Sequence, residues 1–413
     1  MHRFISRQPI LDRFEKVYGY EILFRPGEVE MWPPVNGDRA GESPSPGTPA
    51  FEGIDEITGG ARAFIKCTRQ ALVGGHAAEL PRDQVVLEIP ASREPDEEVV
   101  AACRRLKDAG FLIALEDFQG AWQEPLADLA DIMKLDVTAC TDRTQWLLIR
   151  KYRPRGTIFV ADKVEKRTQF QAAVQQGFSY FQGQFFCRPQ PFSTPEVTPT
   201  KLVYLMVLRA ATRPEIDVQE VTDNIKHDLA LSYKLLRFLN SARFAFRSQI
   251  KSIRHALLLL GQNEIRKWIG LISVAALGEG APPILMTTAL IRAAFCESLA
   301  PLVGAKKRQS DCFFLGLLSC IDVILGRPMR LVLAELPLAP DVSGALVGEQ
   351  NLLHDILQAV ISYEQGNWEE FSLLAKRLAL KEEALGELYL QALRWAGELF
   401  VEEKDKPAEA PHP

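Results

Sequence analysis

Acidic side chains recur at the ends of apolar runs in the first half of the chain. Glu88 lies near the end of Val85–Ile89, and the run that begins at Phe111 stops at Glu116 and Asp117. The same placement recurs further along at Lys134 with Asp136, Asp162 with Glu165, and Gln182. A ring of carboxylates with one lysine is what a pair of hard divalent cations and a phosphate ester require. The pattern therefore predicts a metal-assisted site that acts on a phosphate ester.

Each acid taken singly has a simpler explanation. Asp and Glu are frequent at helix starts, where they cap backbone N–H groups and meet the positive end of the helix dipole. They are also common at solvated strand ends. The repetition on successive segments favours the functional explanation for the set, because chance placement would have to recur each time.

Alternating strands and helices must position these residues. After the early segments, the predicted strands are Val85–Ile89, Phe111–Asp117, Ile132–Val137, Thr157–Val164 and Tyr180–Phe186, and the predicted helices between them are Asp96–Ala109, Pro125–Ala130, Arg143–Tyr152 and Arg167–Gln176. Such alternation indicates a parallel sheet, and this many short units fit a (β/α) barrel better than an open sheet. In a barrel the carboxyl ends of the strands converge on one face, so the polar residues should meet there.

A predicted hairpin precedes this series. Phe4–Ile10 and Val17–Phe24 read as its two strands, with Glu21 near the end of the second. Pro26–Gly53 is rich in Pro, Gly and Ser and predicts a loop. Ile54–Leu72 predicts a mixed helix and strand region that contains Ala63-Phe64-Ile65-Lys66.

The second half is predicted to be all-α. Arg188–Pro199 carries four prolines and indicates a stiff linker. Beyond it, apolar residues recur at three- and four-residue spacing in Lys201–Ala211, Val218–Leu229, Leu231–Asn240, Ile253–Leu260, Asn263–Gly270, Met286–Leu302 and Asp311–Leu325. We therefore predict a barrel domain at 1–190, a Pro-rich linker at 191–200, a helical domain at 201–400 and a disordered tail at 401–413.

Composition places the chain among cytoplasmic globular proteins. Its 413 residues suggest two or three domains, 47% are hydrophobic, and the net charge of -5 gives no reason to expect nucleic acid as a partner. The seven cysteines include no CxxC pair, which indicates reduced core thiols. No apolar run reaches the length of a membrane span, and the N-terminus does not read as a signal peptide.

The first half resembles the EAL domain, the cyclic di-GMP phosphodiesterase fold of bacteria, over roughly positions 3–190. The matched segments, in the family's order, are Gln8-Pro9-Ile10, Gly19-Tyr20-Glu21-Ile22-Leu23-Phe24-Arg25 (EIL where the family has EAL), Leu87-Glu88-Ile89, Glu116-Asp117-Phe118, Lys134-Leu135-Asp136, Ala161-Asp162-Lys163-Val164-Glu165, and Gln182-Gly183 with Arg188-Pro189. The resemblance implies a TIM-like barrel in which Glu21, Glu88, Glu116 and Asp117 hold Mg²⁺ or Mn²⁺, Asp162 activates water that Lys134 orients, and Gln8, Arg25 and Gln182 contact the nucleotide.

The departures from this family bear on activity. Lys66 stands where the family has a metal-binding asparagine, and an ammonium there could occupy the place of a cation. Glu116 is one methylene longer, and Asp162 one methylene shorter, than the family's residues at these positions. Lys163 replaces a glycine, and the family's loop after the paired acids is replaced by Gln119–Pro125. Since a misplacement near 1 Å can cost about a hundredfold in rate, we expect a degenerate EAL domain without catalytic activity.

The second half resembles the HDOD domain, a helical relative of the HD phosphohydrolases without their metal ligands. Asp228–Ser232 leading to Leu235–Ser241 is similar to its DPALSxKLLRxxNS pattern, and Ile253–Gly261 to its IxxAIxxLG segment. Ile361–Trp368, with Leu390–Trp395, resembles the C-terminal part of combined EAL–HDOD signalling proteins. The resemblance therefore covers nearly the whole chain in one domain order.

The leading expectation is a non-catalytic signalling protein that acts through protein contacts in a bacterial cyclic di-GMP-related pathway. No cofactor is then expected, no nucleic acid or membrane is a partner, and cyclic di-GMP is an optional one. Two alternatives stay open. One is a weak or active phosphodiesterase that uses Mg²⁺ or Mn²⁺, and the other is a sensor that binds cyclic di-GMP through Gln8 and Arg25 without cleaving it.

Overall fold

The computed structural model describes residues 5–25, 54–90, 96–118, 124–188, 199–213, 217, 219–220, 250, 252, 255, 261–381 and 384–404. Several predicted segments lie outside these residues. They are the loop Pro26–Gly53, most of the linker 191–200, the segment Gln119–Gln123, and nearly all of the three helices predicted between Val218 and Leu260. The tail beyond residue 404 lies outside them as well.

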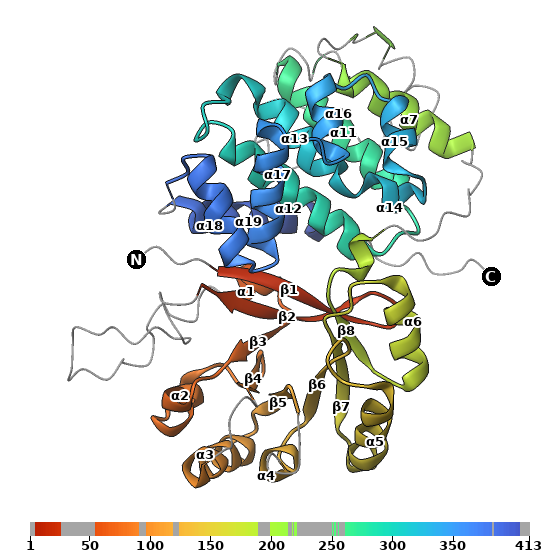
Figure 1. Ribbon diagram of the computed structural model, residues 1–413. Coiled ribbons are helices and arrows are strands. Elements are labelled where there is room, and N and C mark those ends of the chain that lie inside the picture. Colours follow the sequence, from red (N-terminus) through yellow and green to blue (C-terminus); the bar gives the residue numbers. More distant parts are fainter. Residues whose placement is uncertain are drawn as a thin grey trace. The chain divides into compact units, whose positions relative to one another are not determined.

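A closed eight-stranded barrel forms the first half (Figure 1). Its strands, in barrel order, are β1 (Ile5–Asp12), β2 (Val17–Phe24), β3 (Arg62–Lys66), β4 (Val85–Pro90), β5 (Leu112–Glu116), β6 (Ile132–Asp136), β7 (Ile158–Asp162) and β8 (Tyr180–Gln182). Strand β1 is antiparallel to both of its neighbours, β2 and β8, and all the other pairs are parallel. The predicted hairpin and TIM-like barrel are therefore confirmed.

Helices connect the strands and lie around the outside of the barrel (Figure 1). They are α1 (Ile54–Thr58), α2 (Arg69–Val73), α3 (Glu97–Asp108), α4 (Glu124–Ala127), α5 (Asp142–Tyr152) and α6 (Arg167–Gln176). The side chain of Asp96 caps α3 by accepting from the backbone N–H of Val99, and α6 ends at Gly177 as predicted. The predicted strand Tyr180–Phe186 is too long, because β8 ends at Gln182 and a 3₁₀ turn follows at Phe185–Cys187.

The barrel interior has an apolar layer below a polar one. Ile10, Phe64, Val86, Ala114, Ile132 and Val160 form a fully buried cluster. Since side chains alternate between the two faces of a strand, the residue two positions after a buried core residue returns to the inner face. This places Lys66 above Phe64, Glu88 above Val86 and Glu116 above Ala114, as part of the polar layer at the barrel mouth.

The second half is helical, as predicted. Its described helices are α7 (Pro199–Thr212), α11 (Gln262–Leu277), α12 (Pro283–Leu299), α13 (Gln309–Leu317), α14 (Ile321–Leu325), α15 (Met329–Ala334), α16 (Pro340–Leu346), α17 (Leu352–Glu364), α18 (Trp368–Arg377) and α19 (Leu385–Lys404). The single helix predicted over Asp311–Leu325 is divided into α13 and α14 by a 3₁₀ turn at Leu318–Cys320. Helices α12 and α13 pack closely at Gly316, where a Cβ would lie 2.3 Å from backbone atoms of Arg292.

The chain forms two compact units that are not contiguous in sequence. The described residues of Met1–Arg188, Ser362–Trp368 and Glu382–Pro413 form the first unit, and those of Pro189–Ile361 and Glu369–Lys381 form the second. Two segments from the C-terminal part thus belong to the barrel unit, and the domain limits given above stay a prediction. In the described part of the chain, no helix has the length and apolar character needed to cross a membrane.

Candidate functional site

The strand ends bring the predicted residues together at the barrel mouth. Glu88 comes from β4, Glu116 from β5, Lys134 from β6, Asp162 from β7 and Gln182 from β8. Glu21 joins them from β2 of the antiparallel hairpin, where it pairs with Gln8 of β1. The pattern of polar residues after apolar strands therefore located one site.

Lys134 is at the centre of three carboxylates. Its ammonium nitrogen lies 2.7 Å from Glu21 Oε2, 2.6 Å from Glu88 Oε1 and 3.2 Å from Glu116 Oε1, and its side chain is only 1% exposed. A lysine ammonium has three N–H donors, so these three acids use all of them. The acids hold the pKa of Lys134 well above its usual value although burial alone would lower it, and the lysine therefore stays charged.

Lys66 brings a second ammonium to the same carboxylates. Its Nζ lies 2.9 Å from Glu116 Oε2 and 3.9 Å from Glu21 Oε1, and its side chain is 49% exposed. Lys66 thus approaches the acids from the solvent side, whereas Lys134 lies beneath them. Burial lowers the pKa of Lys66, but Glu116 and Glu21 outweigh this effect and the net pKa is raised.

The pKa values of Glu88 and Glu21 are shifted in opposite directions. Burial and the neighbouring charges of Glu21 and Glu116 raise the pKa of Glu88 well above its usual value, with Lys134 opposing them. For Glu21, burial raises the pKa, but Lys134 and Lys66 together lower it by more, so the net pKa is below its usual value. Two ammonium groups, those of Lys66 and Lys134, therefore face these carboxylates and offset much of their negative charge.

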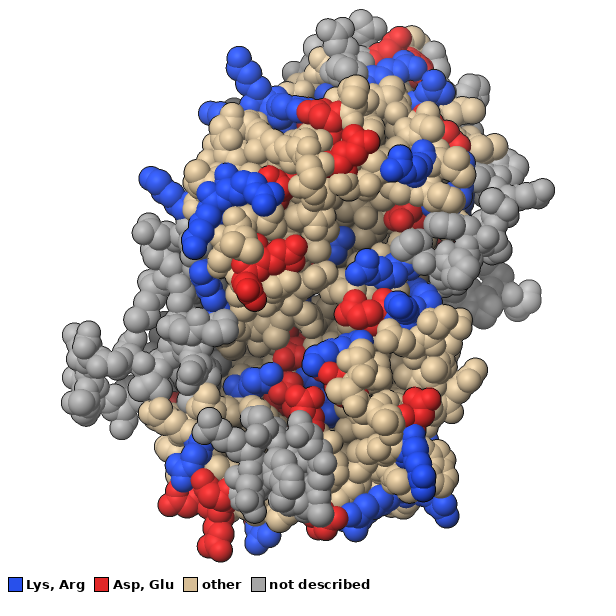
Figure 2. All heavy atoms as spheres, viewed as in Figure 1, with Lys and Arg blue, Asp and Glu red and all other residues tan. Residues whose placement is uncertain are grey.

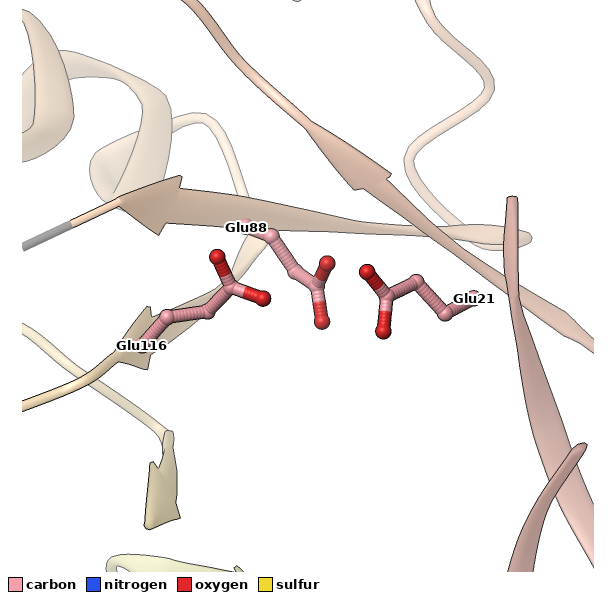
Figure 3. A group of neighbouring side chains, drawn as sticks. All are labelled: Glu21, Glu88 and Glu116. Carbon is pink, nitrogen blue, oxygen red and sulfur yellow. The ribbon is translucent and has the colours of Figure 1, made fainter. Parts of the chain in front are cut away.

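Glu21, Glu88 and Glu116 are also the described residues best placed to hold a metal ion. Their carboxylates point toward one another from β2, β4 and β5 (Figure 3), with one oxygen of each within 4.8 Å of the others. Lys134 and Lys66, however, engage most of these oxygens, and Glu88 Oε2 is the buried one with no hydrogen-bond partner. A pair of hard divalent cations needs many free anionic oxygens. With Lys66 in place, the residues present do not fit such a pair.

The pKa of Asp162 is raised into the range that suits a general base. Burial raises the pKa of its carboxyl to about 6, with Lys134 opposing the effect and Glu21 adding to it. Asp162 Oδ1 accepts a hydrogen bond from the backbone N–H of Lys163 at 2.8 Å. The neighbouring acid Asp136 is occupied differently, because Lys163 Nζ lies 2.6 Å from Asp136 Oδ2 and Thr138 donates to Asp136 Oδ1.

The amide side chains predicted to contact a nucleotide adjoin the acids. Gln182 Nε2 donates to Gln8 Oε1 at 3.1 Å and to Glu21 Oε2 at 2.5 Å. Arg25 follows β2 and is not among the described residues that line the cavity here. Asp117 lines this cavity but lies outside the group of three glutamates, at a positive φ of 47°.

A cavity of about 410 Å³ opens above the acids. Besides the predicted residues, which include Glu165, it is lined by residues that the sequence did not assign to the site: Leu23, Lys163, Gln184 and the turn Gln365–Asn367. Glycine and asparagine at 366 and 367 signal a helix end. No pattern in the sequence links that turn to strands more than 300 residues earlier.

Charges of both signs are interspersed on the surface. Over the face of the molecule shown in Figure 2, Lys and Arg alternate with Asp and Glu among the described residues. This agrees with a net charge of only -5. The described part of this face therefore offers no extended basic surface of the kind that binds nucleic acid.

Comparisons with known proteins cover both halves of the chain. Residues 198–333 match the family described as the HDOD domain. Over 409 residues, the chain is 34% identical to the uncharacterized protein YuxH of Bacillus subtilis (strain 168), covering 97% of this chain and 99% of that protein. It is 30% identical to the cyclic di-GMP phosphodiesterase CdgJ of Vibrio cholerae, covering 96% of this chain and 93% of that protein.

Solved structures of EAL proteins are also similar. One is the YkuI protein of Bacillus subtilis, with an EAL domain, in complex with cyclic di-GMP and calcium. It is 19% identical with a TM-score of 0.33, and the alignment covers 62% of this chain and 72% of that one.

Proposed function

Because this chain belongs to the family of two-domain proteins in which an EAL-type barrel is followed by an HDOD domain, we propose that it is a signal-transduction protein that does not hydrolyse cyclic di-GMP. In this proposal it acts through protein–protein contacts in a bacterial cyclic di-GMP-related pathway. It carries its signal by binding, and neither of its domains turns over a substrate.

The observation that carries the proposal is the position of Lys66. Its ammonium lies 2.9 Å from Glu116 Oε2, in the carboxylate group where a divalent cation would bind. The positive charge of this ammonium repels a cation, and its contact with Glu116 takes up one of the oxygens that would coordinate the cation. Metal-assisted hydrolysis needs the cation to polarise the phosphate and to activate water. With this lysine in place, the carboxylate group of the barrel does not have the charge pattern of a metal centre.

One feature favours a second candidate, a phosphodiesterase of reduced activity. A general base works best when its pKa lies near the operating pH, and the pKa of Asp162 is about 6. The relative CdgJ, at 30% identity, is named a cyclic di-GMP phosphodiesterase. In this reading Glu21, Glu88 and Glu116 would hold Mg²⁺ or Mn²⁺ after Lys66 has moved away.

A sensor that binds cyclic di-GMP without cleaving it is the third candidate. It is favoured by the amides of Gln8 and Gln182, which stand at the cavity beside the acids. Amide side chains carry both a donor and an acceptor, as recognition of a nucleobase edge requires.

The test uses the purified full-length protein with cyclic di-GMP and Mn²⁺. Products are separated by chromatography while binding heat is measured by calorimetry in parallel. We expect no linear dinucleotide. Metal-dependent formation of linear dinucleotide would contradict the proposal and support the phosphodiesterase, whereas binding heat without product would support the sensor.

A further inference from the structure

A turn from the C-terminal part of the chain borders the cavity at the barrel mouth. Gln365, Gly366 and Asn367 line the same cavity as Glu21, Lys66 and Asp162. These three residues belong to Ser362–Trp368, which is part of the same compact unit as the barrel. The wall of the cavity is therefore built from two regions of the sequence, and only one of them is the EAL-like barrel.

Two side chains of β1 hold this turn by its backbone. The hydroxyl of Ser6, which is fully buried, donates to the carbonyl oxygen of Glu364 at 2.7 Å. Gln8 Nε2 donates to the carbonyl oxygen of Gln365 at 2.7 Å. The turn itself is closed by hydrogen bonds from Gly366 N to Tyr363 O at 3.0 Å and from Asn367 N to Ser362 O at 2.9 Å.

Gly366 allows the turn to sit against β2. Its φ is +66°, a left-handed conformation that favours glycine at a helix end. A Cβ on Gly366 would lie 2.6 Å from Leu23 Cδ1 and 3.3 Å from Leu23 Cβ, so the end of the Leu23 side chain or the turn must shift. A branched side chain at 366 would therefore strain the backbone and crowd the turn against β2.

The chemistry of the cavity wall points to a nucleotide-like ligand. Four amide side chains face the cavity, and they are Gln8, Gln182, Gln184 and Asn367. Such groups pair with the mixed donors and acceptors of a nucleobase. The ammonium groups of Lys66 and Lys163, about half exposed, lie at the same cavity and suit a phosphate.

The turn competes with such a ligand for Gln8. One amide hydrogen of Gln8 is committed to the carbonyl of Gln365, and its amide oxygen accepts from Gln182. A ligand acceptor that takes this hydrogen must first replace the Gln365 carbonyl, whereas the turn does not use the second amide hydrogen of Gln8. When the binding-competent state is only a fraction of the molecules, the apparent affinity falls by that fraction.

We propose that the turn Gln365–Asn367, which lines the cavity, is an autoinhibitory cap that lowers the affinity of the cavity for a phosphate-bearing nucleotide until the turn is displaced. This inference rests on the third candidate of the proposed function, the sensor, in which the cavity binds a nucleotide and leaves it intact. Signalling would then begin when the nucleotide, or a partner that pulls the turn away, frees Gln8.

The experiment measures binding of cyclic di-GMP, without added metal, by calorimetry on the full chain. Gly366→Val should displace the cap and tighten binding by at least about tenfold, because the lost contacts include two hydrogen bonds. Ser6→Ala, which removes only the hydroxyl bond to Glu364, should give a smaller increase. Gly348→Val is the matched control: Gly348 also has a positive φ, of 91°, but a Cβ there would meet nothing within 4 Å and the residue does not line the cavity.

Equal or weaker binding by both Gly366→Val and Ser6→Ala would overturn the proposal, as would a failure of all the proteins to bind. A second readout covers the case in which Gly366→Val does not fold. Hydrogen exchange of the peptide that contains Gln365–Asn367 should become faster in the wild-type protein when cyclic di-GMP is added, and slower or unchanged exchange would contradict the cap. Cleavage of the nucleotide, seen separately by chromatography, would refute the proposed function without deciding on the cap.

Discussion

Lys134 and Lys66 form ion pairs with the same carboxylates, but they differ in burial. Lys134 is buried and bonded to Glu21, Glu88 and Glu116, whereas Lys66 is half exposed and contacts Glu116 and Glu21 from the solvent side. Buried ion pairs add little net stability when formed but are costly to break, because removing one partner leaves uncompensated charge in a low dielectric. We therefore assign Lys134 to the integrity of the barrel mouth and Lys66 to the exclusion of a cation.

Lys134→Met should be strongly destabilising. The substitution leaves Glu21, Glu88 and Glu116 facing one another without their buried counterion, so we expect a loss of about 3 to 5 kcal/mol in the free energy of unfolding by urea. Lys151→Met is the control, since Lys151 pairs with Glu124 in an exposed ion pair at 2.6 Å and its loss should cost under about 1 kcal/mol. A cost for Lys134→Met as small as that of the control would show that the acids do not need the ammonium.

Asp162 should make the stability depend on pH in the acidic range. Its folded pKa of about 6 lies above the usual value of 3.8, so between about pH 4 and pH 6 the folded state keeps a proton that the unfolded state has lost. Stability from this group is therefore present at low pH and is lost as the pH rises through 6. From pH 4 to pH 7, wild type should lose about 2 kcal/mol more than Asp162→Asn, in unfolding measured at each pH. A difference between the two proteins that stays constant with pH would refute this assignment.

The elements explain why the site could be read from the sequence. In β3, β4, β5, β6 and β7 a polar residue stands two positions after a residue of the buried cluster, and this period-two spacing alone indicates which side chains share the barrel interior. The same spacing places Lys66 among the acids, since Phe64 belongs to the core. Burial, the pKa shifts and the exact partner of each lysine depend on distances between strands, which local sequence does not encode.

Other features of the elements could not be read in this way. Strand β8 stops at Gln182, four residues earlier than its apolar run suggests, because the chain turns at Gly183 and Phe185 and Phe186 then pack in a 3₁₀ turn. Apolar character reports burial, and a buried turn and a buried strand look alike. The contact between Ser6 and Glu364 joins residues 358 apart, which no local pattern predicts.

The loop after β7 stores backbone strain at Lys163. This residue has a φ of 56°, in the left-handed region that disfavours side chains, at a position where the EAL family has glycine. Lys163→Gly and Lys163→Ala both remove the ion pair with Asp136, so their comparison isolates the backbone. The glycine variant should be more stable than the alanine variant by about 1 kcal/mol in urea denaturation. An alanine variant of equal or greater stability would mean that no strain is held there.

At the scale of the whole molecule, the barrel unit is completed by the C-terminal end of the chain. Tyr363 and Tyr389 are buried with ring centroids 5.0 Å apart, and Arg394 Nε lies 3.1 Å from Glu56 Oε2 on α1. These contacts belong to the first compact unit although the residues come last in sequence. The chain therefore has a barrel unit and a helical unit, as predicted, but no single position in the sequence separates the two.

A fragment that ends at Arg188 should accordingly be less stable than the barrel in the full chain. It lacks Ser362–Trp368 and α19, so part of the apolar surface of the unit becomes exposed to water. We expect a lower melting temperature and stronger binding of a hydrophobic dye than in the full-length protein. A fragment that melts at the temperature of the full chain, without binding dye, would show that these segments contribute nothing to the barrel.

The central claim is that the ammonium of Lys66 takes the place of a cation among the acids, and Mn²⁺ binding tests it most directly. Free Mn²⁺ is counted by electron paramagnetic resonance in titrations of wild type, Lys66→Asn and the control Lys151→Asn, whose lysine is similarly exposed at 44%. Lys66→Asn should bind Mn²⁺ at least about tenfold more tightly than wild type, with the control unchanged, because one repelling charge has gone. Wild type that binds two Mn²⁺ ions as tightly as Lys66→Asn would contradict the claim.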